Sequence, residues 1–154
     1  MKKIYTVLLI VAIFSATNTH ADEELKQAIK ARQGLMKNYL WNAKPLFGMA
    51  KGKIPYDAKK AQIHADNLEL ISKMNNGSLW PKGSDNQAFP EDTRALKKIW
   101  DTFPAIGEKG KAFKKATADL AAVAGDGKDA LKSKIGALGQ SCKGCHDGYR
   151  ADKK

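Results

Sequence analysis

The sequence predicts an all-α fold, an antiparallel up-down four-helix bundle, from three observations. Apolar residues recur at steps of three and four along most of the chain, which is the period of helices that bury one face. No segment shows the sustained apolar–polar alternation that is typical of strands. Four such helical segments follow one another, and helices joined in this way pack as an up-down bundle. The length of 154 residues fits one domain.

The first helix is predicted from residue 22 to about residue 41. Four apolar residues mark its inner face: Leu25, Ile29, Met36 and Leu40. Arg32 falls on the same face. Pro45 should kink or end the helix, because a proline inside a helix removes a backbone hydrogen bond. A break at residues 52–55 follows.

The second helix is predicted from the N-cap Asp57 to about residue 75. Five residues form a possible inner side: Ala61, Ala65, Leu68, Ile71 and Met74. Ile63 and Leu70 lie off that line, so the inner face is ambiguous. Residues 76–92 then form a long loop, and loops of this length in a compact domain are usually functional or packed against something.

The last two helices follow a short helical turn around residues 94–100. The third starts near Thr102, with Pro104 in its first turn, where a missing N–H costs little. Its stripe is Ile106, Gly110, Phe113, Thr117, Leu120 and Ala124. Gly125 and Gly127 end it. The stripe of the fourth helix is Leu131, Ile135, Leu138, Cys142, Cys145 and Tyr149.

Residues 1–21 have the pattern of a secretory signal peptide. Two lysines precede an uncharged apolar run over residues 4–16, and small residues lead to a cleavage point after Ala21. The run is too short to cross about 30 Å of hydrocarbon as a helix, which disfavours an uncleaved anchor. The sequence therefore predicts an exported protein with one domain over residues 22–154, and the periplasm is the expected compartment.

The net charge is +11, from 27 Lys or Arg against 16 Asp or Glu. Cleavage after Ala21 removes two lysines and leaves +9. A charge of this size favours anionic partners. No basic run is interleaved with aromatic residues, which disfavours a nucleic-acid binder. We expect the charge to serve docking with an acidic redox partner protein or an anionic membrane surface.

The segment Cys142-Lys143-Gly144-Cys145-His146 carries the strongest functional signal. On a helix the two cysteines share one face, so both thiols can add to the vinyl groups of one haem while the histidine coordinates the iron. A thioredoxin-like pair would need a preceding strand, and zinc would need further ligands, for which His64 is the only other histidine of residues 22–154. A disulfide across so short a loop would stabilise little. The motif therefore predicts covalent haem c.

Three further stretches accompany this motif: Arg32-Gln33-Gly34-Leu35-Met36, Pro55-Tyr56-Asp57-Ala58, and Thr93-Arg94-Ala95 through Ile99-Trp100. The motif itself continues as His146-Asp147-Gly148-Tyr149-Arg150. Together they resemble the cytochrome c′ family, the class II c-type cytochromes, over residues 22–154. Lys97 and Lys98 depart from the resemblance, because many members have a proline and an acidic residue there.

The resemblance implies roles on the proximal side of one haem. Cys142 and Cys145 would attach it through two thioether bonds. His146 would be the proximal iron ligand, and Arg150 would lie beside that histidine.

It implies further roles around the propionates and the distal face. Arg32 and Gln33 would contact the propionates, which suits a cation and an amide donor that face carboxylates. Thr93 and Arg94 would approach a propionate. Met36 would occupy the distal face. Three aromatic residues are expected to form pocket wall: Trp80, Phe89 and Phe113.

The resemblance leaves two functions for this haem. In the first, five-coordinate iron binds NO or CO and has one-electron redox capacity. In the second, Met36 ligates the iron and the protein is a six-coordinate, low-spin electron carrier. Five-coordinate relatives that have methionine at this position favour the first. His64 is expected to be solvated, and Met49 and Met74 to pack in the core. The chain lacks a distal His-Arg pair, so no enzyme activity is expected.

Relatives in this family commonly dimerise through their first two helices. Four apolar residues of this chain lie outside the inner stripes of those helices: Leu35, Tyr39, Ile63 and Leu70. Such outward apolar positions predict a two-fold homodimer that buries the same patch on both chains.

Overall fold

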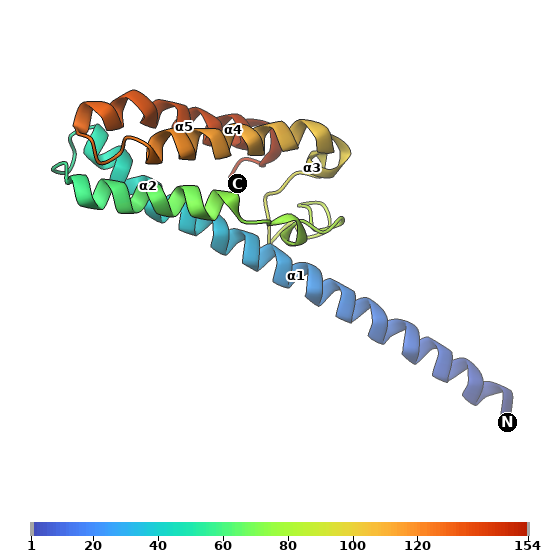
Figure 1. Ribbon diagram of the computed structural model, residues 1–154. Coiled ribbons are helices and arrows are strands. Elements are labelled where there is room, and N and C mark those ends of the chain that lie inside the picture. Colours follow the sequence, from blue (N-terminus) through green and yellow to red (C-terminus); the bar gives the residue numbers. More distant parts are fainter. Residues whose placement is uncertain (1, 154) are drawn as a thin grey trace.

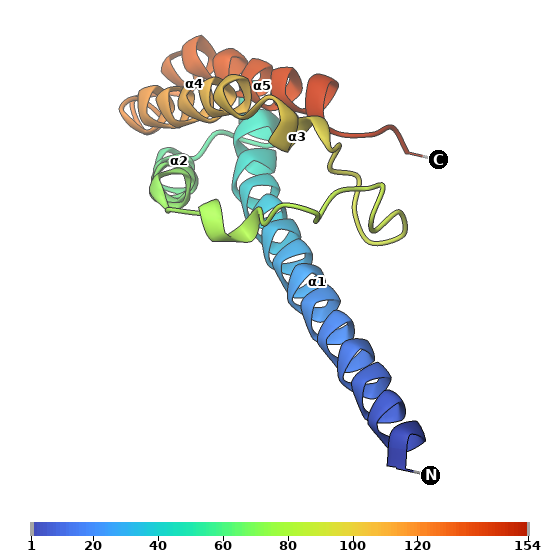
Figure 2. The same cartoon turned by 90° about the vertical axis from the view of Figure 1, so that its right-hand side faces the viewer.

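The computed structural model describes the backbone of residues 2–153 and the side chains of residues 20–153. Its elements are α1 (Lys2–Ala50), α2 (Ala58–Lys73), the short 3₁₀ turn η1 (Gly77–Leu79), α3 (Lys98–Asp101), α4 (Phe103–Ala121) and α5 (Lys128–Tyr149). The C-terminal part of α1 lies with α2, α4 and α5 in a four-helix bundle, while the N-terminal part of α1 projects beyond it (Figures 1 and 2). The predicted fold class is confirmed.

The predicted signal peptide, residues 1–21, lies mostly outside the residues whose side chains the structure describes. The α1 backbone passes through Ala21 without a break, so cleavage there stays a prediction. No helix of the described residues has a stretch long and apolar enough to cross a bilayer.

The first helix is longer at its C-terminal end than predicted, because Pro45 lies inside α1. The residue four positions earlier, Trp41, is 74% exposed, so its freed carbonyl lies on the solvent side of the helix. Leu46 and Met49, which follow the proline, are buried. Their burial offsets the lost hydrogen bond. The helix instead ends before Gly52, whose φ of +70° favours glycine.

The core is built from all four long helices. Its fully buried side chains include Leu46, Leu68, Leu120, Leu131 and Leu138. The predicted stripe of α1 was partly wrong: Ile29 is buried, but Met36 and Leu40 are 39% and 64% exposed. Leu35 is buried in their place, and Tyr39 packs edge-on against Phe113 of α4 at 4.8 Å between ring centroids.

The ambiguous inner face of α2 is resolved by four buried residues: Ala61, Ala65, Leu68 and Ser72. Asp57 caps the helix as predicted, because its side chain accepts a hydrogen bond from the Lys60 N–H. Met74 is exposed, not packed in the core, since α2 ends at Lys73. His64 is not simply solvated: its Nδ1 lies 3.1 Å from Asn42 Oδ1 and links α2 to α1.

The last two long helices agree with prediction apart from one end. α4 begins after Thr102 with Pro104 in its first turn, and it ends at Ala121, a few residues earlier than its stripe indicated. Gly127, with a φ of +124°, lies directly before α5. Before α4, the segment between α2 and α3 crosses back to α1 (Figure 2).

Candidate haem-binding site

The two cysteines lie on one face of α5, three residues apart. Both thiols are free and half-buried, and Cys142 packs against the main core. Burial raises the pKa of both thiols. His146 follows one turn after Cys142 and is also half-buried. Burial, together with Arg150 and Arg94, lowers the pKa of its imidazole, and the neutral imidazole is the form that ligates metals.

Near Cys142, Cys145 and His146, helix α5 does not pack closely against the apolar side of α1. Farther along, a Cβ at Gly139 of α5 would lie 3.5 Å from the ring of Phe47 on α1. Leu40 and Met36 precede Phe47 by seven and eleven residues, so they share its face of α1. Their exposure shows that α5 does not cover them. Two uncovered apolar side chains on α1 and two thiols with an imidazole on α5 fit a flat, largely apolar group such as haem.

A cavity of about 300 Å³ adjoins His146. It is lined by Arg94, Leu96, His146, Asp147, Arg150 and the following residues 151–152. Within the described residues, no three His, Cys, Asp or Glu side chains gather as ligands for one ion. The zinc interpretation of the thiols therefore has no ligand set in this part of the chain.

Arg32 is a buried cation that has only neutral hydrogen-bond partners. Its side chain is 3% exposed and donates to the Ser84 Oγ at 2.6 Å, to the Ser84 carbonyl and to the Thr93 Oγ1 at 3.1 Å. The guanidinium carbon lies 4.9 Å and 5.9 Å from the ring centroids of Trp80 and Trp100. Burial lowers the Arg32 pKa to about 10. The buried carboxylate of Asp85 opposes this lowering of the Arg32 pKa, although it makes no hydrogen bond to the guanidinium.

Its neighbour Gln33 is exposed and donates through Nε2 to the Asp92 carbonyl at 2.6 Å. Arg32 and Gln33, the two residues of α1 that were predicted to contact the propionates, therefore both form hydrogen bonds to the same loop. Asp92 is followed by Thr93, which also accepts from the Ala95 N–H. The loop thus holds a compact polar cluster against α1.

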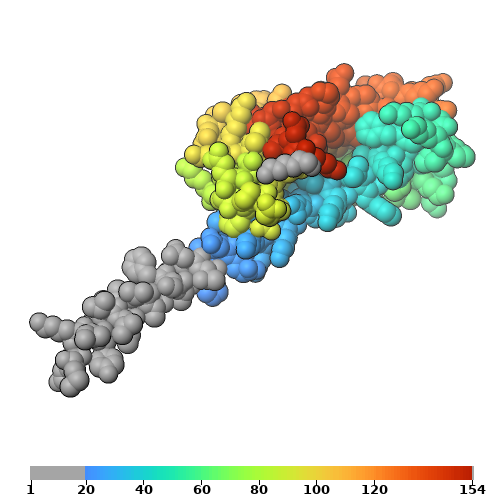
Figure 3. All heavy atoms as spheres, turned by 180° about the vertical axis from the view of Figure 1, so that it is seen from behind, coloured from blue at the N-terminus to red at the C-terminus, as the bar shows by residue number. Residues whose placement is uncertain are grey.

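The chain segment after Thr93 lies beside the C-terminal end of α5. Ala95 and Arg150 form an isolated antiparallel bridge, flanked by the Ala151 N–H to Arg94 carbonyl bond (2.8 Å) and the Leu96 N–H to Tyr149 carbonyl bond (3.0 Å). Figure 3 shows these red C-terminal residues against the yellow-green loop. The bridge brings Arg94 to the cavity that holds His146 and Arg150.

The sequence did not indicate two contributors to the site. Ser84 is fully buried against Arg32 across 52 residues of chain, and no local pattern signals a contact of that separation. Trp100 completes the aromatic surroundings of Arg32 and donates its indole N–H to the Trp80 carbonyl at 3.0 Å. Trp80, expected as pocket wall, flanks the same guanidinium. Phe113 packs against Tyr39.

A four-helix bundle with this cysteine–histidine arrangement on its last helix defines a haem-binding protein of the class II c-type cytochromes. The family model described as Cytochrome C′ matches residues 27–150. The chain belongs to the cytochrome c′ family, whose members bind covalently attached haem c.

Known relatives match nearly the full length of the domain. A cytochrome c′ of Cereibacter sphaeroides is 33% identical, over 99% of this chain and all of the relative. A cytochrome c′ of Halomonas halodenitrificans is 35% identical, over 84% of this chain and 99% of the relative. The solved structure of a Rhodobacter sphaeroides cytochrome c′ superposes with a TM-score of 0.82 at 33% identity, over 84% of this chain and 98% of the other.

Proposed function

We propose that this chain carries one haem c on Cys142 and Cys145, with His146 on the iron, and binds NO or CO. The exposure of Met36 and Leu40 opposite the thiols is the observation that carries the proposal. The bound haem supplies an open iron position for a neutral gas and a one-electron couple.

The side chains around the site have separate tasks in this proposal. Arg32 and Gln33 hold the propionates from α1, and a buried guanidinium whose hydrogen bonds go to Ser84 and Thr93 rather than to a carboxylate suits that task. Thr93 fixes the Arg32 guanidinium, and Arg94 approaches the same edge. Arg150 lies beside His146 and favours its neutral form.

In this proposal Met36 covers the distal face of the haem. Its flexible, apolar thioether excludes water, for which this face offers no hydrogen-bond partner, while NO or CO loses little on desolvation. Solved cytochromes c′ of Alcaligenes xylosoxidans include one variant with bound NO and another with bound carbon monoxide. The alternative, with Met36 as the sixth ligand of a low-spin electron carrier, is less favoured by these relatives.

The variant Met36→Ala should bind CO faster than the wild type and admit water or small anions. The reason is that alanine no longer covers the distal face. Ultraviolet–visible spectra of the ferric and ferrous proteins and CO stopped-flow kinetics measure this. Leu40→Ala, on the same face but one turn farther along, is the matched control and should change the rate less. A low-spin wild type that Met36→Ala converts to high-spin would establish the alternative.

Export through residues 1–21 is part of the proposal. The relative from Halomonas matches 84% of this chain and 99% of its own length, so it is shorter than this chain. The family match begins after residues 1–21, at residue 27. We place the haem domain, residues 22–154, in the periplasm.

The proposed homodimer uses a patch that differs from the predicted one. Leu35 is buried and Tyr39 packs in the core, so neither is available. The exposed apolar residues on and directly after α1 and α2, outside the proposed haem side, include Trp41, Ile63, Leu70 and the C-cap Met74. One solved cytochrome c′ is described as having a ligand-controlled dimer dissociation.

Ile63→Glu/Leu70→Glu should convert the dimer to a monomer, since two charges would be buried at each half of a two-fold interface. Sedimentation velocity at micromolar concentration measures the change. Phe103→Glu, at an equally exposed apolar residue on α4, should leave the dimer intact. A wild-type protein that sediments as a monomer contradicts the proposal.

A further inference from the structure

Positive charge is concentrated on α1. Between Leu25 and Tyr56 the chain has seven Lys or Arg and no Asp or Glu, which is most of the net charge of +9 in residues 22–154. Within residues 20–153, the six recorded ion pairs all join residues three or four apart on α2, α4 and α5. Lysines elsewhere are thus partly neutralised locally, whereas Lys30, Lys37, Lys44 and Lys51 have no Asp or Glu within four residues along the chain.

Four of these lysines form a line, which we call the lysine line: Lys30, Lys37, Lys44 and Lys51. All four are exposed. Their spacing of seven residues falls about 20° short of two helical turns, so the line follows the helix axis for about 32 Å. Evenly spaced, unpaired cations of this kind produce a strong local potential.

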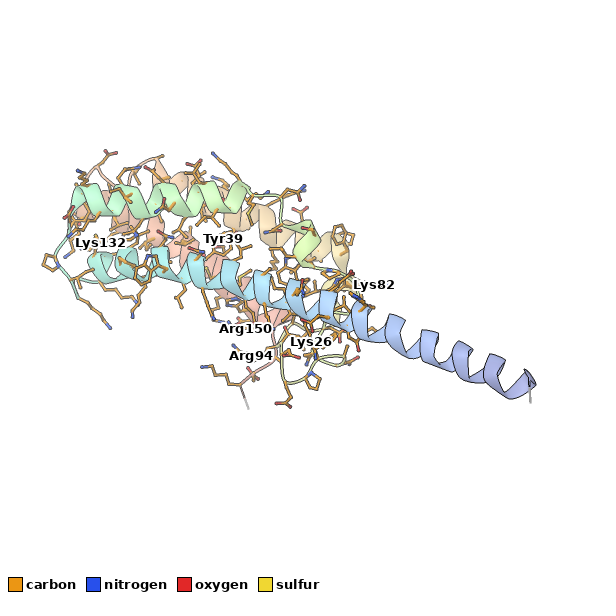
Figure 4. The ribbon with its side chains drawn as sticks, turned by 90° about the horizontal axis from the view of Figure 1, so that it is seen from below. Lys26, Tyr39, Lys82, Arg94, Lys132 and Arg150 are labelled. Carbon is orange, nitrogen blue, oxygen red and sulfur yellow. The ribbon has the colours of Figure 1, made fainter. Side chains whose placement is uncertain are left out.

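The lysine line borders the mouth of the haem site. Lys44 and Lys51 flank Phe47, the residue that faces α5, and the Lys51 Nζ lies 5.9 Å from its ring centroid. Lys37 and Lys44 flank the exposed Leu40 in the same way, three and four residues away. Figure 4 shows Lys26 of α1 on the same side of the molecule as Arg94 and Arg150. Cations of α1, of the segment before α3 and of the end of α5 therefore lie on one side of the molecule.

We propose that the lysine line, together with Arg94 and Arg150, is the docking surface for an acidic electron-transfer protein. This inference rests on the proposed haem function, because the partner is placed at the edge of the haem site. The exposed lysines lie beside the side of α1 that carries Met36 and Leu40, so a partner of opposite charge that docks on them would lie next to the haem site. An acidic protein complements this charge, and the one-electron couple of the proposed haem requires a partner with which it exchanges electrons.

Small charged oxidants test the position of this potential. Ferricyanide accepts one electron from the ferrous holoprotein and becomes ferrocyanide while the haem becomes ferric, and no atom is transferred. In the variant Lys37→Glu/Lys44→Glu, the rate at which ferricyanide oxidises the haem should fall about threefold to tenfold at low salt. The rate of oxidation by the cation tris(phenanthroline)cobalt(III) should instead rise in the same variant. Lys59→Glu/Lys114→Glu changes the net charge equally at exposed residues of α2 and α4, and should alter both rates less than about twofold. Equal effects of the two double variants would overturn the proposal.

Binding gives a readout that does not depend on electron transfer. An acidic [2Fe–2S] ferredoxin should shift amide resonances of residues 30–51, Arg94 and Arg150 in the ¹⁵N-labelled holoprotein, and Lys37→Glu/Lys44→Glu should weaken these shifts. Resonance shifts centred on α2 and α4 would contradict the proposed docking surface. Binding to phosphatidylglycerol vesicles through the lysine line, without ferredoxin binding, would replace the protein partner by a membrane. A normal haem spectrum in every variant separates these failures from a failure of the proposed haem function.

Discussion

A chain with both cysteines replaced, Cys142→Ala/Cys145→Ala, should lose all its haem to acid–acetone extraction, whereas the wild type should retain it. Two thioether bonds hold the group covalently, and without them only the imidazole and apolar contacts remain. A denaturing gel stained for haem measures the difference. The variant should also unfold at a lower temperature, because Met36 and Leu40 lose a tightly held cover.

Two serines on the same helix provide the matched control. Ser133 and Ser141 each donate to a carbonyl three residues earlier, at 2.7 Å and 2.8 Å. Ser133→Ala/Ser141→Ala should therefore keep its haem and nearly all its stability. Haem that stays on the cysteine-free chain after extraction would contradict covalent attachment at these positions.

The second large effect is expected at Arg32. Arg32→Met should lower the free energy of unfolding by about 2–4 kcal/mol, because Ser84 and Thr93 would lose their buried donor. The haem reduction potential should also fall, since a nearby cation favours the reduced state, which carries one positive charge fewer. Chemical unfolding and redox titration of the holoprotein measure the two effects.

The variant Gln33→Ala tests how much of the Arg32 effect on stability comes from burial and how much from contact with the loop. Gln33 reaches the same loop as Arg32, yet its hydrogen bond to the Asp92 carbonyl is exposed. Its loss should cost about 0.5–1 kcal/mol at most. Arg32→Lys should keep the potential close to that of the wild type while losing the stacking with Trp80 and the forked hydrogen bonds. A potential that is unchanged in Arg32→Met would place this guanidinium away from the propionates.

Helix periodicity was sufficient to predict α4 and α5, because both bury a single stripe on a protein core. It failed on α1, where Met36 and Leu40 fit the apolar stripe but are exposed, on the side where we propose that the haem binds. A stripe cannot distinguish burial against protein from burial against a bound group. Pro45 misled for another reason, since a proline on the solvent side of a helix costs less than one facing a neighbour.

The parts of the proposed site that are close together in sequence were predictable, and the parts that come from distant segments of the chain were not. Cys142, Cys145 and His146 lie within five residues, so one motif contains them. The Ser84 partner of Arg32 comes from a long loop, and only the folded chain shows that the loop crosses α1. The bridge between Ala95 and Arg150 likewise joins segments with no complementary pattern in the sequence.

That bridge makes the two sides of the site mechanically dependent on each other. Arg150 is four residues after His146, and Ala95 is two residues after Thr93, which holds Arg32. A rotation of the last turn of α5 would therefore pull on the segment that anchors the buried guanidinium. We therefore expect a displacement of the His146 imidazole to reach the Arg32 hydrogen bonds through these few peptide units.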